Sequence, residues 1–300
     1  MKITSRILSR SLGLLLALTP LANAQNDDQS ALPEAEMTAE DAAAMKAHYD
    51  FIDSLSWVRS GTAQIGDRAT IVIPEGYRFT GAEGSTKLMD YYGNLTNGSE
   101  LGYISPENMD WFAVFEFDDV GYVKEDEKDK LDADEILNQL QEGQKVANEQ
   151  LREMGRPTLN VLGWHTPPFY NNDTKNLEWA IRLSSEDGSE IINYKTKLLG
   201  RRGVMDVVLV CDEEQLGSVV PEYQNLLEGF SYNQEESYAA YTEGDKVAEY
   251  GLIGLIAGGG LLVAAKSGLL AKLWKPIAIG AIAVGSFLKR ILKGKNHDAI

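Results

Sequence analysis

The chain has 300 residues, a formal net charge of −17 at neutral pH and a single cysteine. A chain this acidic repels nucleic-acid phosphates, so we exclude nucleic acid as a partner. One cysteine cannot close an intrachain disulfide, so packing alone must hold the fold together. Cys211 ends a strand-like apolar run, and we expect it to be a buried structural thiol.

The first residues are typical of a secretory signal. Three basic residues precede a short apolar stretch, Leu12–Leu18, and the small residues Ala-Asn-Ala occupy positions 22–24. The stretch is too short to span a bilayer, which takes about 20 apolar residues. We therefore predict a cleaved signal peptide at residues 1–24 and a mature chain that begins at Gln25.

The C-terminal part of the chain is apolar from residue 251 to residue 288, with only a few lysines and serines between. A buried helix seldom runs this long without a polar face, so we predict a membrane anchor with a basic tail at residues 247–300. Val247–Ala265 and Trp274–Ile291 are the candidate transmembrane segments. The lack of a polar face favours a hairpin of two crossings, whereas the positive-inside rule favours one crossing, and both stay open.

Residues 25–246 carry 43 acidic and 18 basic side chains, which gives this part a charge of −25. Residues 247–300 carry a charge of +5. This asymmetry predicts an exported acidic domain at a bacterial inner membrane, on the extracytoplasmic (periplasmic) side, next to a basic tail. It leaves basic proteins, cationic peptides and divalent cations as partners of the domain.

Hydrophobic periodicity predicts the elements of this domain in chain order. Helices are expected at Thr38–Trp57, around Thr86–Tyr92, from the capping residue Asp132 to Met154, and at Val219–Leu227. Strands are expected at Val58–Ile65, Ala69–Ile73, Trp111–Phe117, Leu159–Trp164, Leu177–Ser184, Ile191–Leu199 and Val204–Cys211, with a short one after Gly229-Phe230. Grouped strands with few helices predict an α+β fold, with an antiparallel sheet and helices packed on one face. The order at the end of the domain is similar to that in the sheet domain of PsbP-like proteins.

Four different groups of short motifs follow one another along the chain. They are Gly121-Tyr122-Val123 with Asp126-Glu127, Gly163-Trp164 with Pro168, Tyr170, Thr174 and Leu177-x-Trp179-Ala180, Asn193-Tyr194 with Leu199-Gly200-Arg201-x-Gly203-Val204, and Asp245-Lys246 before the Gly-rich segment. In this order and spacing the chain resembles a bacterial family of predicted membrane-anchored proteins that carries only a domain-of-unknown-function label. The resemblance implies an envelope protein of unassigned biochemistry and offers no catalytic residue.

Motifs for catalysis and for metal binding are missing from the sequence. The acidic run from Asp118 to Glu135 has no window with the ligand spacing of an EF-hand. The three histidines have no zinc-ligand spacing, and no Gly-x-Ser-x-Gly elbow occurs. We therefore predict no catalytic residue, no cofactor and no metal site.

Aromatic residues and an arginine gather within the motifs, and these residue types form binding hot spots. The candidate partner or ligand surface consists of Tyr122, Asp126, Glu127, Trp164, Tyr170, Trp179, Tyr194 and Arg201. The competing interpretation is that Trp164 and Trp179 are core residues on neighbouring strands.

The sequence therefore favours a binding or adaptor domain for envelope or membrane proteins, and whether it is also an enzyme stays open. The alternative is a hydrolase that uses Asp and Glu side chains on cell-envelope material. Such an enzyme needs a concave pocket with at least two carboxylates, one with a raised pKa. An adaptor needs an exposed apolar or aromatic patch. A third hypothesis, a subunit of a transport complex, rests on the Gly-rich apolar segment.

Overall fold

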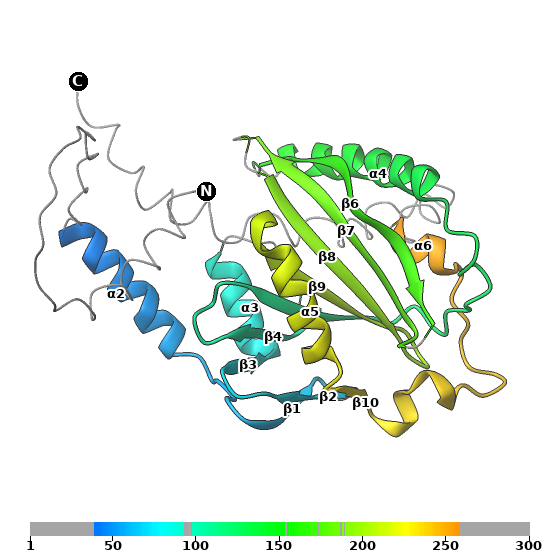
Figure 1. Ribbon diagram of the computed structural model, residues 1–300, viewed down its shortest axis with the longest axis horizontal. Coiled ribbons are helices and arrows are strands. Elements are labelled where there is room, and N and C mark those ends of the chain that lie inside the picture. Colours follow the sequence, from blue (N-terminus) through cyan, green and yellow to red (C-terminus); the bar gives the residue numbers. More distant parts are fainter. Residues whose placement is uncertain are drawn as a thin grey trace, which may run out of the picture. The chain divides into compact units, whose positions relative to one another are not determined.

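The computed structural model describes residues 39–257, apart from 93–95, 97, 154, 156, 173, 187 and 189 (Figure 1). The chain divides after Ser54 into two compact units, and each is described by itself. Helix α2, Ala39–Asp53, is the described part of the first unit. Its end is capped by Ser54, whose hydroxyl donates to the Phe51 carbonyl, so the helix stops four residues before the predicted end at Trp57.

The second unit is built on a seven-stranded sheet in the order β3-β4-β5-β9-β8-β7-β6, in which every neighbouring pair is antiparallel. The strands are β3 Tyr77–Gly81, β4 Glu100–Pro106, β5 Phe112–Asp118, β6 Leu159–Asn171, β7 Asn176–Ser185, β8 Glu190–Leu199 and β9 Val204–Cys211. The strands expected at Leu177–Ser184, Ile191–Leu199 and Val204–Cys211 are confirmed as the antiparallel run β7-β8-β9, and the strand expected at Trp111–Phe117 is confirmed as β5. Cys211 is buried, and burial raises the pKa of its thiol to about 12.

A second, three-stranded sheet has the order β1-β2-β10. Strands β1, Gly61–Ile65, and β2, Ala69–Ile73, correspond to the first two expected strands and form a hairpin, and Gly66 at φ +57° supplies its turn. The chain returns much later to add β10, Phe230–Tyr232, antiparallel to β2. Strand β10 is therefore an edge strand of this small sheet.

Helices cover both faces of the large sheet, so the prediction of helices on one face is wrong. On one side, the α4 face, α4 (Ala133–Glu153) packs on β6 and on Trp179 and Ile181 of β7, together with α6 (Leu252–Ile256). Helix α3, Ala82–Tyr91, packs against β3 and β4. On the opposite side, the α5 face, lie the small sheet and α5 (Leu216–Leu227), which the short helical turn η2 (Glu213–Gln215) precedes.

The large sheet is covered on both faces because its strands are apolar on both faces. In β8, Ile192 and Tyr194 pack toward α5, while Ile191 lies with the α4 cluster. A sheet that is apolar on both sides needs a cover on each. Figure 1 shows the result, with α5 in front of the sheet and α4 behind it.

The start of the predicted membrane anchor belongs to the folded domain. We call residues 237–257 the strap: it begins after the helical turn η3 (Gln234–Glu236), contains η4 (Tyr238–Ala240) and ends with α6. Val247 forms a parallel bridge with Tyr122, and Leu252, Leu255 and Ile256 of α6 are buried in the cluster under α4.

The predicted C-terminal transmembrane segment is therefore corrected. Apolar residues from 247 to 257, read as the start of a crossing, instead cover the protein's own core. Among the residues described, no helix has the length and hydropathy needed to cross a bilayer. The rest of Val247–Ala265, the second candidate segment Trp274–Ile291, the basic tail and the signal at 1–24 lie outside the described residues.

Candidate functional site

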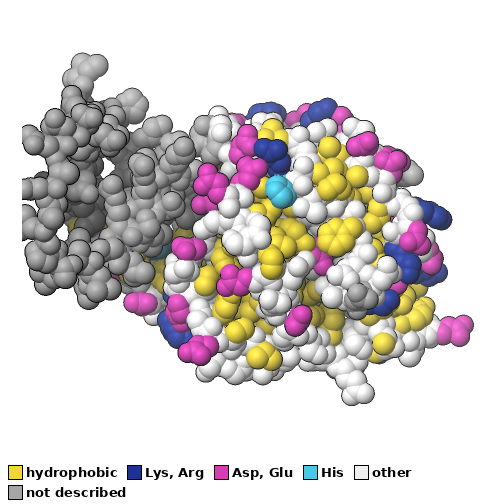
Figure 2. Space-filling view, viewed as in Figure 1, with side chains coloured by type: hydrophobic (Ala, Val, Ile, Leu, Met, Phe, Trp, Pro, Cys, Tyr) yellow, Lys and Arg dark blue, Asp and Glu magenta, His cyan; other side chains and the backbone are white. Residues whose placement is uncertain are grey.

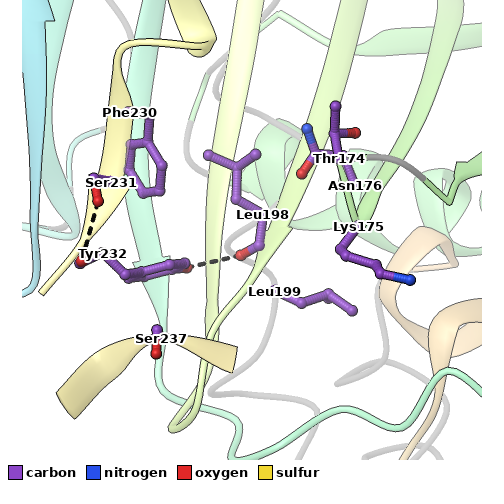
Figure 3. Close-up of a pocket in the computed structure, with 9 residues that line it drawn as sticks. All are labelled: Thr174, Lys175, Asn176, Leu198, Leu199, Phe230, Ser231, Tyr232 and Ser237. Atoms are coloured by element: carbon purple, nitrogen blue, oxygen red, sulfur yellow. Dashed lines mark hydrogen bonds between the residues drawn. The ribbon is translucent and has the colours of Figure 1, made fainter. Parts of the chain in front are cut away.

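The larger of two cavities described below is an open groove of about 260 Å³ on the α5 face (Figure 3). Strand β10 forms one wall, the ends of β7 and β8 form the floor, and the turn between β6 and β7 forms the far rim. The lining residues are Thr174, Lys175, Asn176, Leu198, Leu199, Phe230, Ser231, Tyr232 and Ser237.

The wall made by β10 presents unpaired backbone groups. Val72 N–H donates to the Gly229 carbonyl, and Asn233 N–H donates to the Arg68 carbonyl. In the pairing of β2 with β10, Val72–Gly229 and Arg68–Asn233 are therefore hydrogen-bonded pairs. Residues between such pairs turn their N–H and C=O groups away from the partner strand. These residues are Phe230 and Tyr232, and neither N–H has an acceptor among the residues that the structure describes. The free edge of β10 therefore carries two donors beside the groove.

Tyr232 fixes this edge in place. Its hydroxyl accepts a hydrogen bond from Met205 N–H of β9, at 2.8 Å, and donates to the Leu198 carbonyl of β8, at 2.7 Å. Figure 3 shows the ring reaching from β10 to β8. Burial raises the pKa of Tyr232 above its ordinary value, so the hydroxyl stays protonated and keeps donating. The edge is thus held by two strands of the large sheet.

The groove is almost free of charge. Lys175 is the one charged residue among those that line it, and it sits on the far rim in a left-handed conformation with φ 59°. Leu198, Phe230 and the Tyr232 ring supply apolar surface. A groove with an apolar floor and a free strand edge suits an extended polypeptide better than a charged small molecule.

The structure places the predicted surface residues in several locations, and three of them hold the strap. The Tyr122 ring stacks on both Tyr238 and Tyr241, with ring centroids 4.5 and 4.1 Å away. Arg201 pairs with Asp245, and Glu127 accepts a hydrogen bond of 2.8 Å from Ile253 N–H at the start of α6. Tyr122, Glu127 and Arg201 thus join the first, third and fourth sequence motifs in one set of contacts.

The other predicted residues lie elsewhere. Trp164 is half-buried and donates its indole N–H to the Ala133 carbonyl at the start of α4. Tyr170 and Trp179 are buried in the cluster under α4, as the competing interpretation of Trp179 expected. Tyr194 is buried on the α5 face and donates to Glu178, while Asp126 is exposed in a turn. A joint surface of all eight is therefore not formed by the described residues, and their role toward a partner stays a prediction.

A row of charged side chains crosses the α4 face of β4, β5, β9 and β8. Glu116 and Asp206 lie directly opposite each other in the β5–β9 register, and Lys197 is 2.7 Å from Asp206. Burial, with Asp206 and Glu100 nearby, raises the pKa of Glu116 to about 8. This is the carboxylate pair that a hydrolase would need.

The pair does not line either of the two cavities described in this section. Their linings contain neither Asp nor Glu, and the second has a volume of only about 40 Å³. Within residues 39–257, outside the gaps, no cluster of His, Cys, Asp and Glu is arranged to hold a metal ion. The geometry therefore favours the groove over the carboxylates as the functional site.

Exposed apolar residues do not gather in one patch. Among the described residues, the large ones are spread over α2, both sheets, α4, the strap and the segment before β1: Tyr49, Val58, Val72, Val146, Leu162, Phe169, Tyr241 and Val247. Figure 2 shows apolar side chains dispersed among acidic and basic ones on the α5 face.

The sequence analysis did not predict the groove. The sequence indicates a short strand after Phe230, but it does not indicate that this strand lies at the edge of a sheet.

Comparisons with known proteins give a family and a distant fold match. The family described as "Protein of unknown function (DUF2167)" matches residues 58–288. No curated protein matches the chain. Among solved structures, the solution structure of cyanobacterial PsbP (CyanoP) from Synechocystis sp. PCC 6803 is similar, with a TM-score of 0.35 and 11% identity over 60% of this chain and 93% of that one.

Proposed function

The chain belongs to the DUF2167 family of proteins of unknown function, and from this premise we propose that its domain is a binding module for an extended polypeptide segment. The segment adds as a further strand to the free edge of β10 and lies over the groove. The observation that carries the proposal is the pair of unpaired N–H groups at Phe230 and Tyr232, next to an open apolar floor.

Strand addition uses groups that are already in position. Phe230 offers one N–H and one C=O toward the groove, and Tyr232 offers its N–H, while the Tyr232 C=O already accepts from the Ser231 hydroxyl at 3.3 Å. An added strand can therefore form about three backbone hydrogen bonds with free groups. These bonds carry no sequence preference. Tyr232 is anchored to β8 and β9, so the edge needs no rearrangement to receive a strand. A preformed edge lowers the entropic cost of binding.

Side-chain selectivity comes from the groove and from the charge of the domain. Because successive side chains of a strand alternate, every second one faces the floor formed by Leu198 and its neighbours, and we expect it to be apolar. Residues 25–246 carry a charge of −25, which attracts a partner with basic residues around that apolar position. The partner we propose is therefore an extended, basic and apolar segment of another protein.

We also propose that this binding takes place on the extracytoplasmic side of the bacterial inner membrane, with an envelope or membrane protein as the partner. The support is the secretory character of residues 1–24 and the acidity of the following domain. Cell fractionation, with N-terminal sequencing of the purified chain, tests the location. Recovery of an uncleaved chain from the cytoplasm would contradict it.

The binding proposal is tested with the purified full chain and a display library of random heptapeptides. One selected heptapeptide is synthesised, with a scrambled heptapeptide as a control. We expect the selected peptide to slow amide hydrogen exchange at Phe230 and Tyr232, because those N–H groups gain acceptors. Failure to select any sequence, or protection confined to other strands, would overturn the proposal.

A matched pair of variants locates the site. Ser231 lines the groove, and Thr62 lies on the same face of the small sheet but on β1. Both side chains are exposed, so Ser231→Tyr and Thr62→Tyr each introduce the same tyrosine side chain at little cost to folding. Ser231→Tyr should abolish peptide binding, and Thr62→Tyr should preserve it. Equal affinities of the two variants would place the peptide elsewhere.

A further inference from the structure

A buried carboxyl group lies on the α5 face, one step along the large sheet from the peptide groove. Glu178 of β7 is 3% exposed and lies opposite Thr196 of β8. The next pair on this face is Asn176 and Leu198, and both of these residues line the groove. Side chains on the same face of a strand repeat about every 7 Å. Glu178 and Thr196 therefore continue the floor of the groove.

One oxygen of this carboxyl group remains available. The Tyr194 hydroxyl donates at 2.5 Å and the Gln224 side-chain amide donates at 3.1 Å, and both bonds reach Oε2. Oε1 accepts no hydrogen bond from the described residues, and it is not among the unpaired atoms that are sealed from solvent. The described lysines and arginines form no ion pair with Glu178. A carboxylate this buried usually has a cation beside it, so Glu178 is equipped to receive one.

An exposed aromatic ring lies beside Glu178. Phe169 of β6 is opposite Glu178 in the register, so the two side chains share the α5 face, and Phe169 is 37% exposed. Gln224, which contacts Glu178 from α5, is exposed as well. Lysine and arginine have an apolar stem and a cationic end, and a cation is attracted both to an aromatic face and to a carboxylate. These groups therefore suit a basic side chain.

The direction of β10 leads an added strand toward Glu178. Figure 3 shows β10 and β8 running in the same direction, with Phe230 above Tyr232 and Leu198 above Leu199. A strand added to β10 therefore follows β8 as well. Its alternate side chains have the same spacing of about 7 Å as those of the sheet. When one of them lies over Leu198, the next one beyond Phe230 reaches the row of Glu178.

We infer that Glu178 is the specificity-determining residue of the peptide groove and receives a lysine or arginine of the bound segment. The inference rests on the proposed function, and it gives the basic residue a position, two residues from the apolar residue over Leu198. The charge of the domain attracts basic segments in general, whereas Glu178 selects one position. Tyr194 is a positioning residue, because its hydroxyl holds Oε2 and leaves Oε1 for the cation. Burial, and then Glu178, raise the pKa of Tyr194, so its hydroxyl keeps donating.

Peptide selection on the full chain tests the inference. Heptapeptides are selected on the unmodified chain and on Glu178→Gln, which keeps an oxygen for Tyr194 and removes the charge. Peptides from the unmodified chain should carry Lys or Arg two residues from an apolar residue, and those from Glu178→Gln should lack this preference. Replacing the basic residue by norleucine should weaken binding to the unmodified chain about tenfold and leave binding to Glu178→Gln unchanged.

Two outcomes would overturn the inference at this stage. Peptides that protect Phe230 and Tyr232 from amide exchange without preferring a basic residue would contradict it and leave the proposed function standing. The matched control is Glu228→Gln, which removes the same charge from an exposed glutamate at the end of α5. It should preserve the preference for a basic residue. An equal loss of preference in the two variants would show that net charge, rather than Glu178, selects the peptide.

A small probe separates this inference from the proposed function. n-Butylguanidinium has the charge and the stem of an arginine side chain, but it has no backbone to add to β10. It should shift the NMR signal of the Gln224 side-chain amide in a saturable way, and Glu178→Gln should abolish the shift. A shift that persists in Glu178→Gln would place the cation elsewhere and overturn the inference. Binding of the probe at Glu178 without selection of any peptide would overturn the proposed function and the peptide role of Glu178, and would keep only its cation site.

Discussion

The guanidinium of Arg201 holds the carboxylate of Asp245 through two hydrogen bonds, of 2.7 and 2.8 Å. Arg201 follows β8, and Asp245 lies 44 residues later in the strap. A bidentate pair fixes orientation as well as distance. It therefore helps to set the path of the chain from residue 237 to α6.

Asp245→Asn should loosen the strap. The hydrogen bond from Arg201, with a further one from Thr242 N–H, holds the pKa of Asp245 below its ordinary value. Because the pKa of Asp245 is lower in the folded state, this carboxylate contributes its full stabilisation above the unfolded-state pKa of about 3.9. The stabilisation is lost as pH falls from there through the lower pKa of the folded state. We expect faster amide exchange at Tyr122 and Ala248, whose N–H groups bond across the strap, in the variant at pH 7. In the unmodified chain the same change should appear only in acid.

Asp126→Asn is the matched control, because Asp126 is an exposed aspartate in the same motif as Tyr122. It should leave exchange at Tyr122 and Ala248 unchanged. Equal effects of the two substitutions would show that loss of negative charge, rather than loss of the Arg201 contact, loosens the strap.

Glu116→Gln should change how stability depends on pH. Burial first, and then Asp206, raise the pKa of Glu116 to about 8, so the folded state binds a proton that the unfolded chain releases near pH 4.3. Stability from this group is full below the unfolded pKa and falls as pH rises toward 8. The slope is at most about 1.4 kcal/mol per pH unit. Urea unfolding from pH 5 to pH 8 should show this decline in the unmodified chain and a smaller one in Glu116→Gln.

Glu135→Gln serves as the comparison, because Glu135 is exposed at the start of α4. The free energy of unfolding of this variant should depend on pH as that of the unmodified chain does. If Glu116→Gln also follows it, Glu116 is ionised in the folded state at neutral pH.

Tyr122→Leu should destabilise the domain by about 1–3 kcal/mol, because Tyr122 stacks on two rings and each aromatic pair contributes about 0.5–1.5 kcal/mol. Tyr241→Leu removes only one of the two stacks and should cost about half as much. Urea unfolding measures both. A larger loss for Tyr241 would show that the stack is not centred on Tyr122.

Local patterns in the sequence predicted much of the fold. The cap of α4 is an example: Asp132 accepts from Asp134 and Glu135 N–H, at 3.1 and 3.0 Å. Strands β3 and β4 were missed, because β4 mixes Glu100, Gly102 and Ser105 with its apolar residues and shows no clear alternation. Buried polar residues hide a strand from an analysis based on hydrophobicity.

The groove and the strap depend on contacts between distant residues. Phe230 and Tyr232 have a free edge because of the order of strands in the small sheet, which no local pattern reveals. Residues 247–257 are apolar enough to be read as membrane-spanning, and hydropathy cannot distinguish burial under α4 from burial in lipid. The motif residues Tyr122, Glu127 and Arg201 were selected as a surface because aromatic and charged types serve binding and intrachain contacts alike.

Gly203→Ala should destabilise the domain by about 1–3 kcal/mol through overpacking, because a Cβ atom there would overlap the Asp118 carbonyl and lie 2.8 Å from the Phe117 ring. Neither neighbour can move without disturbing the β5–β9 ladder, in which Asp118 pairs with Val204. The control is Gly217→Ala, where nothing lies within 4 Å of the added carbon. Gly217 is inside α5, so alanine should stabilise by about 0.5–1 kcal/mol through helix propensity. Urea unfolding should therefore shift in opposite directions for the two variants, and a shift in the same direction would contradict the close packing at Gly203.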